Sequence, residues 1–106
     1  MIITMEEEVK NYLDKNGAKK LLIDMTPDLT NSGCGCGKAK KYYTPYIRIM
    51  KSDEYYKDYT LYHTDNADIF LSPKVLEAAE DVIKIKLEKT LFMKKLEVEG
   101  IGFIVE

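Results

Sequence analysis

The sequence contains only two cysteines, and they stand almost side by side. Cys34 and Cys36 are separated by a single residue, Gly35. One pair of cysteines is too few for a domain that disulfide bonds hold together. A disulfide between residues so close in sequence would also restrict almost none of the unfolded chain. In a reducing cytosol both side chains are expected to be thiols. We therefore predict that they serve chemical reactivity or metal ligation.

The sequence also lacks a long apolar segment and a strong charge of either sign. No run approaches the roughly 20 apolar residues that a membrane helix needs, and residues 1–8 have neither the basic start nor the apolar core of a signal peptide. The 16 basic and 18 acidic side chains give a net charge of −2, which supplies no long-range attraction for nucleic acid or an anionic membrane. We therefore predict a cytoplasmic protein with neither nucleic acid nor membrane among its partners.

Motifs of the common enzyme classes are missing as well. The sequence has no P-loop, no Rossmann glycine pattern and no serine-nucleophile motif. The glutamates at residues 6–8 are explained by the positive end of a helix dipole, which nearby acidic side chains stabilise. An enzyme is therefore not expected.

The apolar pattern predicts an α+β fold. The length of 106 residues suits a single domain over residues 1–106, with mostly antiparallel sheets in a sandwich-like arrangement. Thr4 and Glu7 form a capping box, which predicts an N-terminal helix over residues 5–15. Asn16-Gly17 supplies the left-handed stop of this helix.

A second, short helix is predicted from Ser72-Pro73 to about residue 80, because serine caps a helix and proline suits its first position. This helix would bury Val75, Leu76 and Ala79. Alternating apolar residues, often β-branched or aromatic, predict the strands. These strands cover residues 19–26, 42–50, 55–63, 69–71, 83–88 and 95–99.

The two cysteines lie in a long loop, residues 27–41, that carries no apolar periodicity. A loop of this length in a small domain is typical of a functional or a disordered segment. Its glycines allow backbone amides to turn toward sulfur, and its lysines would lower the thiol pKa and favour thiolate, the form that ligates metals. The loop-shaping glycines are Gly33, Gly35 and Gly37, and the lysines are Lys38, Lys40 and Lys41.

Ligation through Cys34 and Cys36 is the first function that these residues suggest. Iron, an iron–sulfur cluster and zinc are the candidates, but two thiolates are half of the four ligands that such sites usually have. A two-fold homodimer would bring four thiolates together. His63, which lies near Asp65 and Asp68 in the sequence, is a further candidate metal ligand.

Two other functions stay open. Cys34 and Cys36 could cycle between dithiol and disulfide, since a Cys-x-Cys disulfide is strained and oxidising. The protein could instead be a non-catalytic interaction domain in which the cysteines are incidental. Seven tyrosines between Tyr42 and Tyr62 suit half-buried strands. A stacking platform for single-stranded nucleic acid would need a matching basic run, which is missing.

The order of these elements resembles the HesB-like, A-type iron–sulfur carrier superfamily, in particular its small HesB-related (seleno)protein group with the CC/Se motif. Residues 6–15 are similar to the family's first helix. The strand at residues 21–25 is followed, as in that family, by a glycine–cysteine loop, here residues 32–37. Residues 69–76 resemble the family's strand and short helix, and residues 96–101 look like its closing strand.

The resemblance implies a HesB-like β-rich fold, a role in iron–sulfur cluster assembly, and assembly or redox proteins as partners. Cys34 or Cys36 would match the first cysteine of the A-type carriers, a position that is selenocysteine in some HesB-related proteins. A-type carriers end with a second Cys-x-Cys, whereas residues 102–106 contain none. We therefore expect Cys34 and Cys36 to form half of a site that a second subunit, a partner or an oxidant completes.

Overall fold

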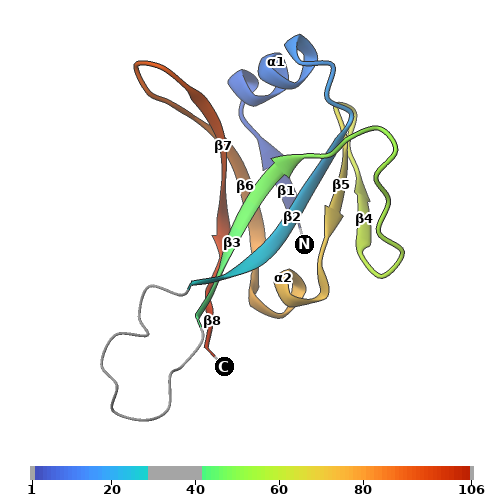
Figure 1. Ribbon diagram of the computed structural model, residues 1–106, viewed down its shortest axis with the longest axis vertical. Helices are drawn as coiled ribbons and strands as arrows, with labels where there is room; N and C mark the ends of the chain where they lie inside the picture. Colours follow the sequence, from blue (N-terminus) through green and yellow to red (C-terminus); the bar gives the residue numbers. More distant parts are fainter. Residues whose placement is uncertain (1, 29–41, 106) are drawn as a thin grey trace.

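The computed structural model describes residues 2–28 and 42–105, and within these ranges eight strands form two sheets (Figure 1). The two helices lie at opposite ends of the molecule. The elements are β1 (Ile2–Met5), α1 (Glu7–Lys15), β2 (Lys20–Asp28), β3 (Tyr42–Ile49), β4 (Thr60–His63), β5 (Asp68–Leu71), α2 (Pro73–Ala78), β6 (Ala79–Lys89), β7 (Lys94–Ile101) and β8 (Ile104–Val105).

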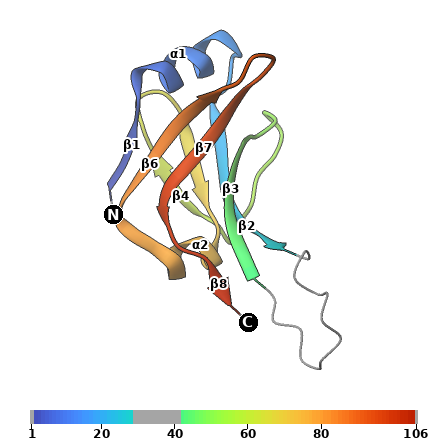
Figure 2. The ribbon, with the colours of Figure 1, turned by 90° about the vertical axis from the view of Figure 1, so that its left-hand side faces the viewer.

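The two sheets have the strand orders β1-β6-β7 and β4-β5-β2-β3-β8. Most neighbours are antiparallel, but β1 pairs with β6 and β2 pairs with β5 in parallel. Figure 2 shows the three-stranded sheet lying against the five-stranded sheet. The predicted α+β fold, with mostly antiparallel sheets in a sandwich-like arrangement, is confirmed.

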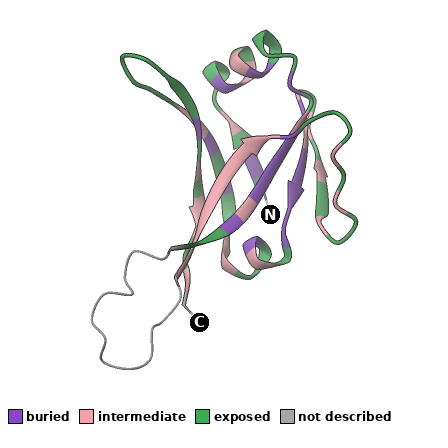
Figure 3. Cartoon of the chain, viewed as in Figure 1, coloured by how far each residue is buried: buried purple, intermediate pink, exposed green. Residues whose placement is uncertain are grey.

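The main core fills the space between the two sheets and the helices. Side chains alternate between the two faces along β2 and β6, so one apolar row of each strand points into the core. Val9 and Leu13 of α1 point into the same core. Figure 3 shows these buried positions on the facing elements. The residues of this core with at most 1% exposure are Val9, Leu13, Leu21, Ile23, Ile69, Leu71, Val75, Ile83 and Ile85.

The start of the chain differs from the prediction. Ile2–Met5 form a strand rather than a capped helix start, and α1 begins at Glu7. Glu6 is the N-cap and makes no side-chain capping bond, so the Thr4 capping box was wrong. Pairing with β6 explains the difference, because it buries Ile3 in the core, and a capping bond contributes only about 1 kcal/mol. The predicted stop is confirmed by Gly17, whose φ is +63°.

Other boundaries also differ. β2 runs through Pro27 to Asp28, although the strand was expected to end at residue 26 and the loop to begin at residue 27. The strand expected over residues 55–63 is formed only by β4, Thr60–His63. The second helix is capped by the Ser72 hydroxyl, which accepts the Val75 N–H at 3.2 Å as predicted, but it ends at Ala78. Leu76, expected to be buried, is 38% exposed. The chain enters β6 at residue 79, where strand pairing replaces the last helical turn.

The outer face of the five-stranded sheet is covered by residues 51–59. Leu22 and Phe70 point outward from β2 and β5, and together with Met50 they form a second, smaller core. Tyr56 and Tyr59 of the covering segment pack against it, with ring centroids 4.9 Å apart. Leu22 is therefore buried although it lies on the opposite face from Leu21 and Ile23.

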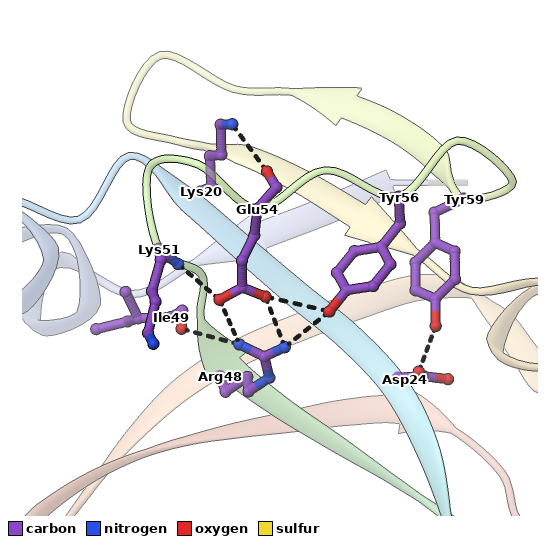
Figure 4. A network of polar contacts seen from close by, with 8 residues as sticks. All are labelled: Lys20, Asp24, Arg48, Ile49, Lys51, Glu54, Tyr56 and Tyr59. Carbon is purple, nitrogen blue, oxygen red and sulfur yellow. Dashed lines mark hydrogen bonds and ion pairs between the residues drawn. The ribbon is translucent and has the colours of Figure 1, made fainter.

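An ion pair fixes this covering segment to the sheet (Figure 4). The Arg48 guanidinium of β3 donates to both carboxylate oxygens of Glu54, at 3.1 and 2.8 Å. The Tyr56 hydroxyl and the Lys51 backbone N–H also donate to this carboxylate, at 3.1 and 2.9 Å. The hydrogen bond from Arg48 is the largest of the causes that lower the pKa of Glu54 to about 2, followed by the one from Lys51. The Glu54 carboxylate is therefore fully satisfied by groups of the fold.

We predict that this carboxylate stabilises the protein in a pH-dependent manner. Because its pKa is lowered from 4.5 to about 2, its contribution is present above pH 4.5 and is lost as the pH falls toward 2. Urea unfolding should show Glu54→Gln to be less stable than the wild type at pH 7, with a difference that shrinks below pH 4.5. Glu99→Gln, at an exposed pair with Lys86, is the control and should change stability little. A Glu54→Gln difference that is the same at every pH would contradict the prediction.

A second prediction concerns Gly100 of β7. Its φ of +92° is unfavourable for other residues, and a Cβ at this position would collide with the Val82 carbonyl oxygen of β6. Gly100→Ala should therefore lower the free energy of unfolding by about 3–5 kcal/mol, measured in urea. Gly17→Ala is the control, because Gly17 also has a positive φ but open space around it, and it should cost about 1 kcal/mol. Equal losses of unfolding free energy in the two variants would contradict the prediction, because they would show that the positive φ alone, and not the collision with Val82, causes the loss.

Candidate functional site

The predicted cysteine site lies outside the described residues. Cys34 and Cys36, with Gly33, Gly35 and Gly37 and with Lys38, Lys40 and Lys41, belong to residues 29–41. The structure describes where this segment is attached. Asp28 and Tyr42 are paired neighbours at the ends of antiparallel β2 and β3. The segment therefore begins and ends at adjacent positions of one sheet, and Gly35 is its middle residue in the sequence.

The attachment point carries aromatic side chains on both faces of β3 and a lysine, and we call this set the loop base: Pro27, Tyr42, Tyr43, Lys74 and Phe103. The rings of Tyr42 and Phe103 lie 6.3 Å apart, and the Lys74 ammonium lies 4.3 Å from the centre of the Tyr43 ring. Tyr43 also pairs with Ile104 of β8. Figure 1 places α2 and β8 at this end of the sheet. The fold thus brings three separate segments together beside the cysteine-bearing connection.

Lys74 is a residue that the sequence analysis missed. It belongs to α2, far along the chain from the cysteines, and reaches the loop base only because β5 pairs with β2. Cation–π contact with Tyr43 places its positive charge near the strand end from which residues 29–41 leave. The sequence did predict helix α2, which carries Lys74. The position of this helix beside β3 depends on the pairing of distant strands, which the sequence does not show.

His63 occupies the other end of the sheet. Its Nδ1 atom lies 2.7 Å from a carboxylate oxygen of Asp68, its cross-strand partner, and its side chain is 73% exposed. Asp68 pairs with Lys20 at the first residue of β2, whereas the cysteine segment follows the last residue, Asp28. The length of β2, about 26 Å at 3.3 Å per step, separates these ends. The fold does not bring His63 to the loop base.

No other metal site emerges from residues 2–28 and 42–105. Within these ranges no three His, Cys, Asp or Glu side chains are grouped closely enough to hold a metal ion. A cavity of about 420 Å³ lies between the end of α1 and the turn at residues 64–68. Asp14, Asp65 and Asp68 are among its lining residues, but they do not form such a group.

The tyrosines of residues 42–62 contribute to packing in the parts of the fold described above. Tyr43 and Tyr62 border the main core, and Tyr56 and Tyr59 border the second core. The Tyr59 hydroxyl donates to an Asp24 carboxylate oxygen, and burial is the main cause of its raised pKa. Tyr55 meets the edge of the Phe70 ring, with centroids 5.7 Å apart. These contacts account for five of the seven tyrosines by packing against the two cores or the Phe70 ring.

Neither helix in the described part of the chain combines the length and the apolar character that crossing a membrane requires.

Solved structures with a similar fold include two proteins. SufA of Escherichia coli, described as involved in the biosynthesis of iron–sulfur clusters, matches with a TM-score of 0.59 and 12% sequence identity, over 93% of this chain and 80% of SufA. IscA, solved with a [2Fe-2S] cluster, matches with a TM-score of 0.57 and 12% identity, over 93% of this chain and 82% of IscA. At this identity the similarity establishes the fold, and it confirms the predicted HesB-like architecture.

At the level of sequence, no curated protein matches the chain. A family model does match it, over residues 1–101, and this range includes both sheets up to the end of β7 as well as the two cysteines. The predicted relationship to the small HesB-related group with the CC/Se motif is thereby confirmed. The protein belongs to the CC/Se motif containing family.

Proposed function

We propose that this protein is an iron–sulfur carrier-like protein that binds an iron–sulfur cluster or iron through Cys34 and Cys36. The observation that supports this proposal is the shared fold with SufA, which is involved in iron–sulfur cluster biosynthesis, and with IscA, which was solved with a [2Fe-2S] cluster. No observation favours zinc. The cluster or iron would be cargo of the protein rather than part of a catalytic step.

The two cysteine thiolates are suitable ligands for an iron–sulfur cluster, but they are fewer than a cluster needs. Thiolates are the usual ligands of iron–sulfur clusters, which commonly take four of them. The sequence supplies two cysteines, so a second copy related by two-fold symmetry would supply the other two. An assembly or redox protein that contributes its own ligands would complete the site equally well. Such a shared site suits a carrier, because the cluster is then held at a surface from which it can be passed on.

The surroundings of the cysteines support thiolate chemistry. Gly33, Gly35 and Gly37 allow the backbone to turn its amides toward sulfur. Positive charge stabilises thiolate, and the sequence places three lysines directly after the cysteines. The three lysines that follow the cysteines are Lys38, Lys40 and Lys41.

Anaerobic reconstitution with iron and sulfide tests the proposal. The wild-type protein should acquire visible absorption and bound iron, and replacing Cys34 and Cys36 by serine should abolish both, because the hydroxyl is a poor ligand for iron at neutral pH. His63→Ala is the control. Its side chain lies at the opposite end of β2 from the cysteine segment, so this variant should load as the wild type does.

Size measurement of the loaded protein identifies how the site is completed. A dimer that forms only with the cluster would support ligation across two copies. If the wild type acquires neither iron nor colour, ligation by the cysteines is contradicted. Titration of the two thiols in redox buffers then tests the thiol–disulfide alternative, which requires reversible oxidation of Cys34 and Cys36.

A further inference from the structure

The hairpin between β6 and β7 ends in three exposed apolar residues. Leu91, Phe92 and Met93, which we call the apolar tip, are 95%, 94% and 67% exposed. The hairpin extends away from the body of the molecule (Figures 1 and 3), at the end opposite the loop base. Three consecutive large apolar side chains in water are unfavourable for solubility and add nothing to the core.

The turn that presents the apolar tip is well defined. The Thr90 backbone N–H donates to the Met93 carbonyl oxygen at 2.8 Å, and the Thr90 hydroxyl donates to the same oxygen at 3.2 Å. The Met93 N–H donates to the Thr90 hydroxyl oxygen at 3.1 Å. Turns usually use Gly, Asn, Asp or Pro, and none of these is present between Thr90 and Met93. Local folding rules therefore do not explain the residues of the tip.

Lysines surround the apolar tip. Lys89 and Lys94 are direct cross-strand partners, an arrangement of like charges that weakens a hairpin, and Lys95 follows. Residues 89–95 contain no acidic side chain, but Glu88 is the cross-strand partner of Lys95, and a Glu8 carboxylate oxygen of α1 lies 3.3 Å from the Lys89 ammonium. The lysines lie one or two residues behind the tip, which is about 3–7 Å along the strands. The hairpin end thus carries a collar of three lysines behind the apolar tip, with two carboxylates, Glu8 and Glu88, beside it and a net positive charge.

We propose that the apolar tip inserts into the interface of an anionic lipid bilayer. The depth of such an insertion, about 5–10 Å, matches the spacing between the tip and the lysines, which would then lie among the lipid phosphates. A bilayer adapts to a convex point, whereas a protein partner would have to offer a pocket of matching shape. The charge of the collar favours anionic over neutral lipid. The contact is peripheral and is independent of the proposed cysteine site.

This surface changes one expectation from the sequence. The prediction of no membrane partner was based on the total charge and on the absence of a long apolar run. Neither quantity detects three apolar residues at a turn that the fold holds away from its body.

The sequence contains no tryptophan, which gives a direct test. Phe92→Trp introduces a single fluorophore at the tip, and Phe103→Trp introduces one at the loop base, where Phe103 is 65% exposed. With vesicles of phosphatidylcholine containing about 30 mol% phosphatidylglycerol, the emission of the Phe92→Trp variant should shift to the blue and be quenched by brominated acyl chains. The emission of the Phe103→Trp variant should change in neither respect.

Vesicle sedimentation of variants measures which residues contribute to binding. Replacing Leu91, Phe92 and Met93 together by serine should weaken binding at least about tenfold, and Lys94→Glu with Lys95→Glu should do the same for anionic vesicles. Ile2→Ser, at a residue 57% exposed outside the tip, should bind as the wild type does. Urea unfolding verifies that each variant is folded.

The outcomes separate the two kinds of partner. Binding to anionic vesicles that depends on both the tip and the lysines supports the proposal. The proposal is overturned if the wild type binds neither anionic nor pure phosphatidylcholine vesicles, or if the serine variant binds as well as the wild type. A pocket on a protein partner would then be the expected binding site for the tip. Vesicle binding is measured on protein that holds no cluster. A failure of iron loading would therefore contradict the proposed cysteine site without changing the result for the apolar tip.

Discussion

The rest of the structure depends on the burial of β2 on both of its faces. Leu21 and Ile23 face the three-stranded sheet, and Leu22 faces outward into the second core. A strand with apolar residues on both faces needs two covering layers, since either face alone would expose apolar surface to water. The second layer is the segment over residues 51–59, which the Arg48–Glu54 pair attaches to β3. β2 is therefore covered on both faces at residues 21–23, whereas Thr26 and Pro27, nearer the cysteine segment, are exposed.

This arrangement gives the molecule two ends with different surfaces. At one end β2 and β3 lead into the cysteine segment, beside the aromatic rings and the lysine of the loop base. At the other end the hairpin of β6 and β7 presents apolar side chains and lysines. The two surfaces are carried by different sheets. One surface can therefore change its residues without disturbing the packing of the other.

Much of the fold could be predicted from the sequence because its signals are local. The alternation at Ile83 and Ile85 identified β6, and Ser72-Pro73 identified the start of α2. The prediction failed where distant pairing overrides a local pattern, as when pairing with β6 turned Thr4 into a strand residue. The cysteine pair stood out through composition alone. Lys74 and the exposed hairpin tip could not be found in this way, because only the folded chain shows which surface a side chain occupies.

The parallel pairing of β1 with β6 has a consequence for synthesis of the protein. Ile2 has Val82 as its partner, so β1 leaves the ribosome long before its neighbouring strand has been made. Contacts between residues so far apart in sequence slow folding, because a large loop must close before they form. The nascent chain therefore cannot build its smaller sheet one element at a time. That sheet is completed only after β6 and β7 have followed β2 to β5 and α2 out of the ribosome.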